Sequence, residues 1–320
     1  MFDVSDGISV SEKPNYNFTG ARLPPTAHRK TPNVTEPVIK IFTTSDGYQH
    51  HYRHWQPADR PKSFIVALHG IQSHSGWYEH SSRTLCEAGH EVLFIDRRGS
   101  GLNEKERGHA RHQRRLVNDV AQFLRDVRER RNESAPTAPV VLLGLSWGGK
   151  LAAVVASRFQ ALIDGLVLLY PGIQSKVRAN EWDKFRLALA EAGEVLEKRV
   201  PIPLDDPRKF TSNPEAQQFI RDDELALHDV TVSFLLANRD LDRLVERAAP
   251  NIRCPTSMFL AGRDEIIDNP GAKRWFETLA SQERNLIEYP DATHTLEFDP
   301  ARDQFEADLL TWLDGLLKTT

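Results

Sequence analysis

Cysteine and long apolar runs are scarce in this sequence of 320 residues. The only two cysteines, Cys86 and Cys254, are too few for a disulfide framework. No apolar run approaches the roughly 18 residues that a transmembrane helix requires. The first ten residues, MFDVSDGISV, lack the basic and apolar regions of a signal peptide. We therefore expect a soluble, cytoplasmic protein without a transmembrane segment.

Excess charge of one sign is also absent, since 41 basic residues stand against 45 acidic ones. A protein that binds nucleic acid through a general basic surface is therefore not expected. Three histidines, His50, His51 and His54, lie close together, but no cysteine or acidic pattern with metal-ligand spacing accompanies them. We expect a solvated strand face there and no metal site.

What the sequence does contain is an alternation of short buried strands and amphipathic helices. Asp46-Gly47 between two β-prone runs, 38–44 and 48–55, predicts a hairpin. Helical patterns occur near 77–88, 116–127 and 271–280 and at the carboxyl terminus. Continuous apolar runs predict buried strands at 63–68, 92–96, 140–145, 165–170, 257–262 and 285–290. This order predicts an α/β fold with a mostly parallel central sheet flanked by helices.

The chain divides into an N-terminal arm, a core and one insertion. Residues 1–36 are polar and rich in proline, which predicts an arm without a regular period. The core is expected to comprise residues 37–171 and 251–320. Residues 172–250 are too long for a bare connection between strands. They predict a helical cap packed on one edge of the sheet.

The sharpest chemical signal is Gly144-Leu145-Ser146-Trp147-Gly148-Gly149, directly after a predicted strand and at the start of a helical stretch. A serine on such a tight strand-to-helix turn projects its hydroxyl above the sheet, beside the N–H groups of the helix N-terminus. Ser146 is therefore the predicted nucleophile. The alternative is an ordinary glycine-rich turn that carries an incidental serine.

A serine hydroxyl needs a base, and the base needs an acid that orients it. His294 follows the last predicted strand and is the predicted base. Asp264, just after the preceding strand, is the favoured acid. Its rivals in the same two loops are Glu265, Asp268 and Asp291. The backbone N–H groups of Trp147 and Ile71 are the predicted oxyanion donors, and His69 is expected to hold the loop.

These motifs resemble the α/β-hydrolase superfamily and, within it, the monoacylglycerol lipase and lysophospholipase group, also classified as the serine aminopeptidase S33 family. The resemblance covers about residues 38–318 and implies Ser146, Asp264 and His294 as a triad. A segment in the predicted cap, Asp206–Asp223, is similar to the family's helical lid. The motifs that carry the resemblance are His69–Tyr78, Asp96–Gly101, Gly144–Gly149, Gly262-Arg263-Asp264 and Ala292-Thr293-His294.

The resulting functional prediction is a serine hydrolase that cleaves small, lipid-derived carboxylic esters through an acyl-enzyme, without a metal or an organic cofactor. Thioester, amide or peptide hydrolysis on the same triad remains an alternative, as does a non-catalytic ligand-binding protein. Trp147 and Ile71 replace the methionine and the small residue that are common in the family, which favours a short, medium or aromatic acyl group. Apolar cap residues either line an acyl channel or pack the cap onto the core: Trp182, Phe185, Leu189, Phe234 and Leu235.

Overall fold

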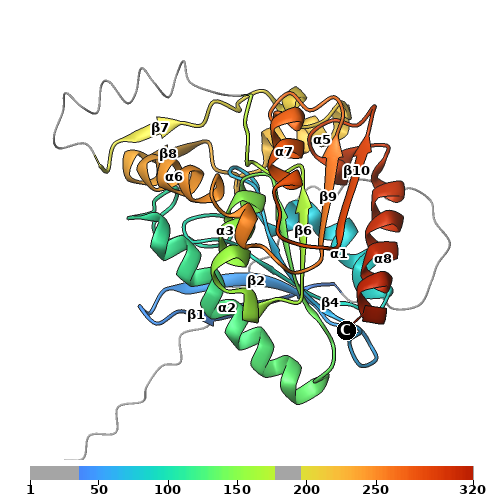
Figure 1. Cartoon of the computed structure of the whole chain (residues 1–320). Coiled ribbons are helices and arrows are strands. Elements are labelled where there is room, and N and C mark those ends of the chain that lie inside the picture. Colours follow the sequence, from blue (N-terminus) through green and yellow to red (C-terminus); the bar gives the residue numbers. More distant parts are fainter. Residues whose placement is uncertain (1–35, 177–195, 320) are drawn as a thin grey trace, which may run out of the picture.

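The computed structural model describes residues 36–176 and 196–319 (Figure 1). Its centre is an eight-stranded sheet with the strand order β1-β2-β4-β3-β5-β6-β9-β10. β2 runs antiparallel to both of its neighbours, and the other pairings are parallel. The predicted hairpin and all the predicted strands are present. The strand predicted at 285–290 is not buried as expected, however, because it forms an edge of the sheet and only its last residue, Tyr289, is buried. The strands are β1 Val38–Thr43, β2 Gln49–Trp55, β3 Phe64–Leu68, β4 Glu91–Ile95, β5 Val140–Leu145, β6 Gly165–Leu169, β9 Thr256–Ala261 and β10 Arg284–Tyr289.

Helices cover both faces of the sheet (Figure 1). Every residue of β3, β4, β5, β6 and β9 is buried, which explains why these strands are continuous apolar runs and do not alternate. Within the described ranges, no helix combines the length and the apolar character needed to cross a membrane. The helices of the core are α1 Glu79–Glu87, α2 Gln113–Ser134, α3 Trp147–Arg158, α7 Asn269–Glu277 and α8 Arg302–Thr319.

α2 extends well beyond the predicted segment 116–127. It begins after His112, whose ring nitrogen Nδ1 accepts a hydrogen bond from the Arg115 N–H and so caps the helix. Its last residues are polar, and they carry no apolar period that would have marked the helix in the sequence. The apolar pattern therefore located the part of the helix that faces the core and missed both ends.

The histidines of β2 are less exposed than predicted. His50 and His54 are buried and not solvated. β1 pairs along the outer side of β2, and the side chain of Asp119 on α2 lies 3.4 Å from His50 Nε2. His54 Nε2 lies 2.8 Å from Glu91 Oε1. In the described part of the chain, no group of three histidine, cysteine or acidic side chains is arranged to hold a metal ion.

The sequence predicted an insertion on one edge of the sheet. The described part of this insertion, residues 172–176 and 196–250, instead lies over the carboxyl ends of the strands (Figure 1). Its described part is not purely helical either. Two short strands, β7 Arg199–Pro201 and β8 Asp229–Thr231, form an antiparallel pair beside α5 Pro214–Asp222 and α6 Val232–Val245. The prolines of the segment 201–203 disfavour a helix there. Trp182, Phe185, Leu189 and the arm up to residue 35 lie outside the described residues.

A buried carboxylate fixes the insertion to the loop after β3. Asp223 follows α5, and its Oδ2 accepts hydrogen bonds from Trp77 Nε1 at 2.6 Å and from His74 Nε2 at 3.0 Å. Burial acts to raise the pKa of Asp223, but the hydrogen bond from His74 and its charge, together with the Trp77 bond, outweigh burial and lower it. The charged carboxylate is therefore the stable form in this contact.

Two backbone hydrogen bonds also join the insertion to the core. The Leu227 N–H donates to the Gln72 carbonyl at 2.9 Å, and the Thr295 N–H donates to the Phe210 carbonyl at 2.8 Å. Gln72 belongs to the loop after β3, and Thr295 to the loop after β10. The insertion is therefore bonded to two of the loops that the sequence assigned to the site.

Candidate active site

Ser146 lies on a strained turn between β5 and α3. Its backbone angles, φ 50° and ψ −121°, are outside the regions that a serine ordinarily adopts. The serine N–H donates to the Leu169 carbonyl of the neighbouring strand β6 at 2.9 Å, which holds the turn against the sheet. This geometry directs the hydroxyl away from the sheet, as in the sharp turn expected from the sequence.

Gly148 allows the start of α3 to approach the end of β3 closely. A Cβ at this position would lie 2.4 Å from the Leu68 carbonyl oxygen and 2.5 Å from the His69 carbonyl oxygen. Both atoms belong to the backbone and have little freedom to move. A glycine is therefore required here by contact with the loop after β3.

We expect Gly148→Ala to lower the free energy of unfolding by about 2 kcal/mol, because the added methyl group overpacks a site surrounded by backbone. The matched control is Gly315→Ala in α8, where an added Cβ meets nothing within 4 Å. That substitution should raise stability by about 0.5–1 kcal/mol, as is usual for an exposed helical glycine. Chemical denaturation of both variants measures the difference, and equal effects would contradict the proposed crowding at Gly148.

The structure brings Ser146, His294 and Asp264 together. His294 Nε2 lies 3.0 Å from Ser146 Oγ, and His294 Nδ1 lies 2.7 Å from Asp264 Oδ2. Ser146 follows β5, Asp264 follows β9 and His294 follows β10, so parallel strands deliver all three residues to the same end of the sheet. His294 and Asp264 are buried. The three side chains form one continuous hydrogen-bonded chain.

Asp264 is held in one orientation by its own loop. Its Oδ1 accepts hydrogen bonds from the Ile266 N–H at 2.7 Å and the Ile267 N–H at 2.9 Å, which leaves Oδ2 for the histidine. The rival acids lie elsewhere. Asp291 forms an exposed ion pair with Arg263, and Glu265 is exposed. Asp268 precedes α7 and is partly exposed.

Two aromatic residues that the sequence analysis did not select enclose His294. The ring of Tyr170 lies edge-on to the imidazole with centroids 4.7 Å apart, and Phe210 of the insertion lies 5.9 Å away. Tyr170 follows β6 directly and has a left-handed conformation, with φ 36°, and burial raises the pKa of its phenol well above the usual value. Its place directly after a buried strand was a usable signal. No sequence signal pointed to Phe210, because only the folded chain brings its ring close to His294.

The two residues predicted to supply the oxyanion donors, Ile71 and Trp147, belong to segments that lie next to Ser146. Gly70 packs so closely on Ser146 that an added Cβ would lie 3.8 Å from Oγ, which places the Gly70-Ile71 segment beside the nucleophile. In residues 36–176 and 196–319, the Ile71 N–H has no hydrogen-bond acceptor. Trp147 is the first residue of α3, and N–H groups in the first helical turn lack an intrahelical acceptor. Two backbone donors are thus available next to Oγ.

His69 holds this loop, as expected. Its Nε2 accepts a hydrogen bond from the Arg97 N–H at 3.1 Å, so the ring proton resides on Nδ1, which faces the Gly70 carbonyl. Ser100 Oγ lies 3.0 Å from the same Nε2 and donates its own proton to the Arg97 carbonyl. Burial, assisted by the charge of Arg97, lowers the pKa of His69 to about 3. A neutral histidine therefore connects the loop after β3 to the loop after β4.

The side chain of Trp147 is directed toward the insertion. Its Nε1 donates to Asn238 Oδ1 of α6 at 2.7 Å, and its ring stacks on Phe234 with centroids 5.6 Å apart. Phe234 and Leu235, two of the apolar residues selected for the cap, are both buried. Their burial agrees with the second of the two roles considered for these residues, in which they pack the insertion onto the core.

The sequence was compared with protein families and with individual known proteins. Residues 59–301 match the family described as serine aminopeptidase, S33. The chain is 28% identical to monoglyceride lipase of Homo sapiens over 272 residues, covering 84% of this chain and 87% of the relative. It is 25% identical to monoacylglycerol lipase of Mycolicibacterium smegmatis over 269 residues, covering 82% and 91%.

The fold is shared with solved structures of lower sequence identity. A soluble variant of monoglyceride lipase from Saccharomyces cerevisiae, in complex with a substrate analog, superposes with a TM-score of 0.78 at 18% identity. The match covers 90% of this chain and 97% of that one. The predicted fold class and family are thereby confirmed. The chain has the α/β-hydrolase fold and belongs to the serine aminopeptidase S33 family.

Proposed function

We propose that this protein hydrolyses carboxylic esters of lipid-derived acids through an acyl-enzyme formed on Ser146. The observation that carries the proposal is the continuous hydrogen-bonded chain from Ser146 Oγ through His294 to Asp264. A hydroxyl on a strained turn, a buried imidazole and an oriented carboxylate are the parts that acyl transfer requires. The S33 family membership and the lipase relatives support the same reaction class.

In the proposed mechanism, His294 Nε2 accepts the Ser146 proton while Oγ attacks the ester carbonyl. The Ile71 and Trp147 N–H groups stabilise the negative charge on the carbonyl oxygen. The imidazolium then protonates the departing alcohol. Water, activated by the same histidine, attacks the acyl-enzyme and releases the acid. Asp264 keeps the histidine proton on Nδ1 and stabilises the imidazolium.

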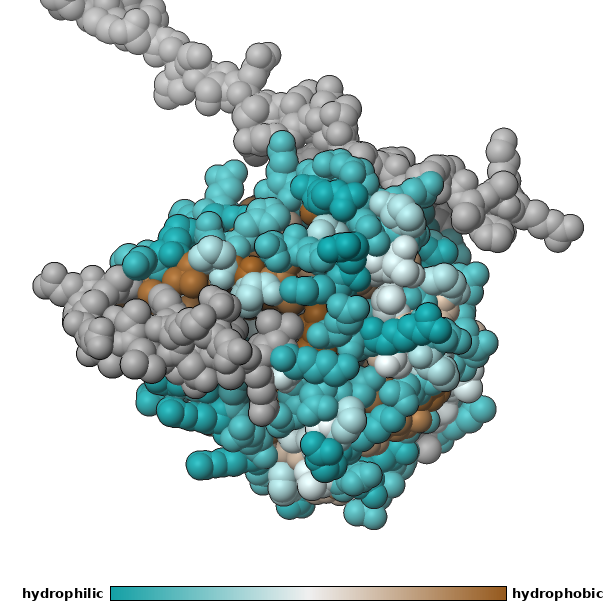
Figure 2. All heavy atoms as spheres, turned by 90° about the horizontal axis from the view of Figure 1, so that it is seen from above, coloured by the Kyte–Doolittle hydropathy of each residue, from teal (hydrophilic) through white to brown (hydrophobic). Residues whose placement is uncertain are grey.

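The proposed substrate has an apolar acyl group. Its main support is that the two relatives compared above are lipases of monoacylglycerols. Figure 2, a view from above, shows hydrophobic residues exposed between hydrophilic ones on this face of the molecule. We assign residues 172–250 as a cap over the core of 37–171 and 251–320. The bulk of Ile71, beside the nucleophile, favours a short or medium acyl chain over a long one.

A fluorophosphonate probe and a graded ester series test this function. We expect the probe to label Ser146, with mass spectrometry placing the adduct on that residue. Among nitrophenyl esters, kcat/KM should peak at short or medium acyl length. Thioester and anilide analogues of the best acyl group should react more slowly than the ester. Failure to label the folded protein would indicate a non-catalytic binding protein. Faster reaction with the thioester or anilide would instead support the alternative hydrolases.

A further inference from the structure

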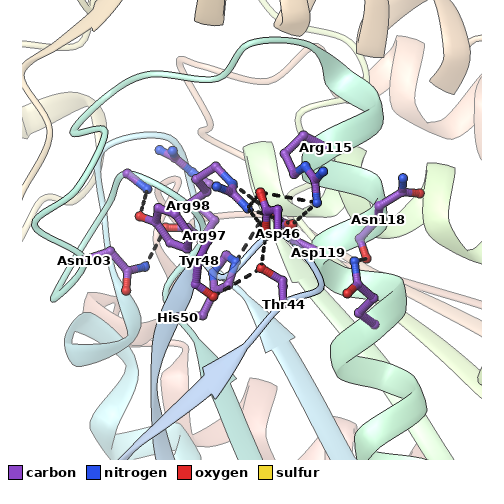
Figure 3. Close-up of polar contacts among 12 residues, drawn as sticks. Thr44, Asp46, Tyr48, His50, Arg97, Arg98, Asn103, Arg115, Asn118 and Asp119 are labelled. Carbon is purple, nitrogen blue, oxygen red and sulfur yellow. Dashed lines mark hydrogen bonds and ion pairs between the residues drawn. The ribbon is translucent and has the colours of Figure 1, made fainter.

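The loop after β4 carries two adjacent buried arginines with very different surroundings. Arg98 is compensated by acids: it bonds Asp119 through Nε at 2.8 Å and Asp46 through Nη2 at 3.0 Å, and it also contacts Glu106 (Figure 3). Burial opposes its charge, but the bonds to Asp119 and Asp46 outweigh burial and raise its pKa. Its guanidinium also lies 3.9 Å from the ring centroid of Tyr48. Arg98 therefore has a complete structural explanation.

Arg97 has no comparable partner. It is buried to about the same degree as Arg98, yet no acid in the described ranges forms an ion pair with it. Its Nε and Nη1 have no hydrogen-bond partner there either. Burial, with the nearby charge of Arg107, lowers the pKa of Arg97 to about 9, although the charge of Asp96 partly opposes this effect. A buried guanidinium without an ion-pair partner is costly, and its presence points to a function that offsets the loss in stability.

The contacts that Arg97 does make converge on the two predicted oxyanion donors. Its Nη2 donates a hydrogen bond to the Ile71 carbonyl. Its guanidinium lies over the Trp147 ring, 5.0 Å from the centroid, and 5.2 Å from that of Phe234. One side chain thus contacts the residue on each side of the proposed oxyanion.

We propose that Arg97 is a positioning residue for the oxyanion hole. This inference rests on the proposed function. The hydrogen bond to the Ile71 carbonyl fixes the orientation of residue 71, whose own N–H must face the carbonyl oxygen of the substrate. The cation–π contact holds the Trp147 side chain and thereby the first residue of α3. The buried positive charge also favours negative charge that develops nearby in the transition state.

The test compares an ester with its thionoester, in which sulfur replaces the carbonyl oxygen. Sulfur accepts hydrogen bonds poorly, so an intact oxyanion hole favours the ester, and a misplaced one loses part of this preference. The variants are Arg97→Met and Arg97→Lys. The matched control is Arg98→Met, which removes an equally buried guanidinium that contacts neither donor. Each variant is first titrated with the fluorophosphonate, so that rates refer to folded sites only.

We expect Arg97→Met to lower kcat for the ester by about 100-fold, the effect of losing one well-placed donor, with KM changed by less than about threefold. The thionoester rate should fall by less than about tenfold, so the ester-to-thionoester ratio drops. Arg97→Lys keeps the positive charge but lacks the planar guanidinium group, so it should give an intermediate ester-to-thionoester ratio. It supplies the same readout if the methionine variant does not fold. Arg98→Met should lower the melting temperature and leave the ratio unchanged.

Equal losses on both substrates in the Arg97 variants would overturn the inference and leave the proposed function standing. A ratio that falls to the same extent in Arg98→Met would overturn it as well, because the effect would then be one of loop stability. Wild-type protein that turns over no ester would instead contradict the proposed function and the inference with it.

Discussion

Replacing Ser146 by alanine is expected to lower ester turnover by about 10⁴- to 10⁶-fold. The hydroxyl is the only part removed, and without it neither His294 nor the two backbone donors can form an acyl-enzyme. Stability should change little. Alanine keeps the Cβ, so the turn packs as before, and the hydrogen bond that is lost joins Oγ to one partner, His294. Steady-state kinetics with a nitrophenyl ester and thermal unfolding measure the two effects.

The matched control for this variant is Ser157→Ala on the same helix, α3. Its hydroxyl donates to the Val154 carbonyl at 2.8 Å, one turn back along the helix. Ser157→Ala should retain wild-type turnover and phosphonate labelling. Substantial residual activity in Ser146→Ala, above that of a mock purification, would show that another residue is the nucleophile.

Asp264→Asn is expected to lower kcat by about 10⁴-fold, although it changes one side-chain oxygen to nitrogen. The Ile266 and Ile267 N–H groups both donate to Asp264 Oδ1, so an asparagine would keep its carbonyl oxygen there. Its NH₂ group would then face His294 Nδ1 and force the ring proton onto Nε2. The histidine in this tautomer cannot accept the Ser146 proton.

The comparison variant is Asp291→Asn, which removes the charge of the rival acid in the exposed pair with Arg263. Exposed ion pairs contribute little to stability, so this substitution should change neither the free energy of unfolding nor kcat appreciably. Kinetics of both variants, with phosphonate titration of the active fraction, decide between the two acids. A larger loss in Asp291→Asn than in Asp264→Asn would reverse the assignment of the acid.

The features predicted correctly were those that local sequence determines. The turn around Ser146 follows from glycines next to a buried strand. The meeting of Ser146, Asp264 and His294 follows from parallel strands, whose carboxyl ends share one edge. Arg97 was missed for a different reason. Its contacts are with residues far along the chain, and no local pattern distinguishes Arg97 from Arg98.

The insertion was predicted least well, again for a physical reason. Its length showed that it exists, but its short strands pair across about 30 residues, from Arg199 to Thr231, and carry no apolar alternation. Its position over the strand ends depends on single contacts such as the one between Asp223 and Trp77. A lone acid in a polar segment gives no sign of such a role.

The bonds between the insertion and the core have a consequence for access to the site. The Leu227 and Phe210 backbone contacts end on the loops that carry Ile71, the proposed oxyanion donor, and His294, the proposed base. A rigid-body opening of this half of the insertion would therefore break both hydrogen bonds or displace both loops. Uncovering Ser146 by such a movement would disturb the loops that surround it.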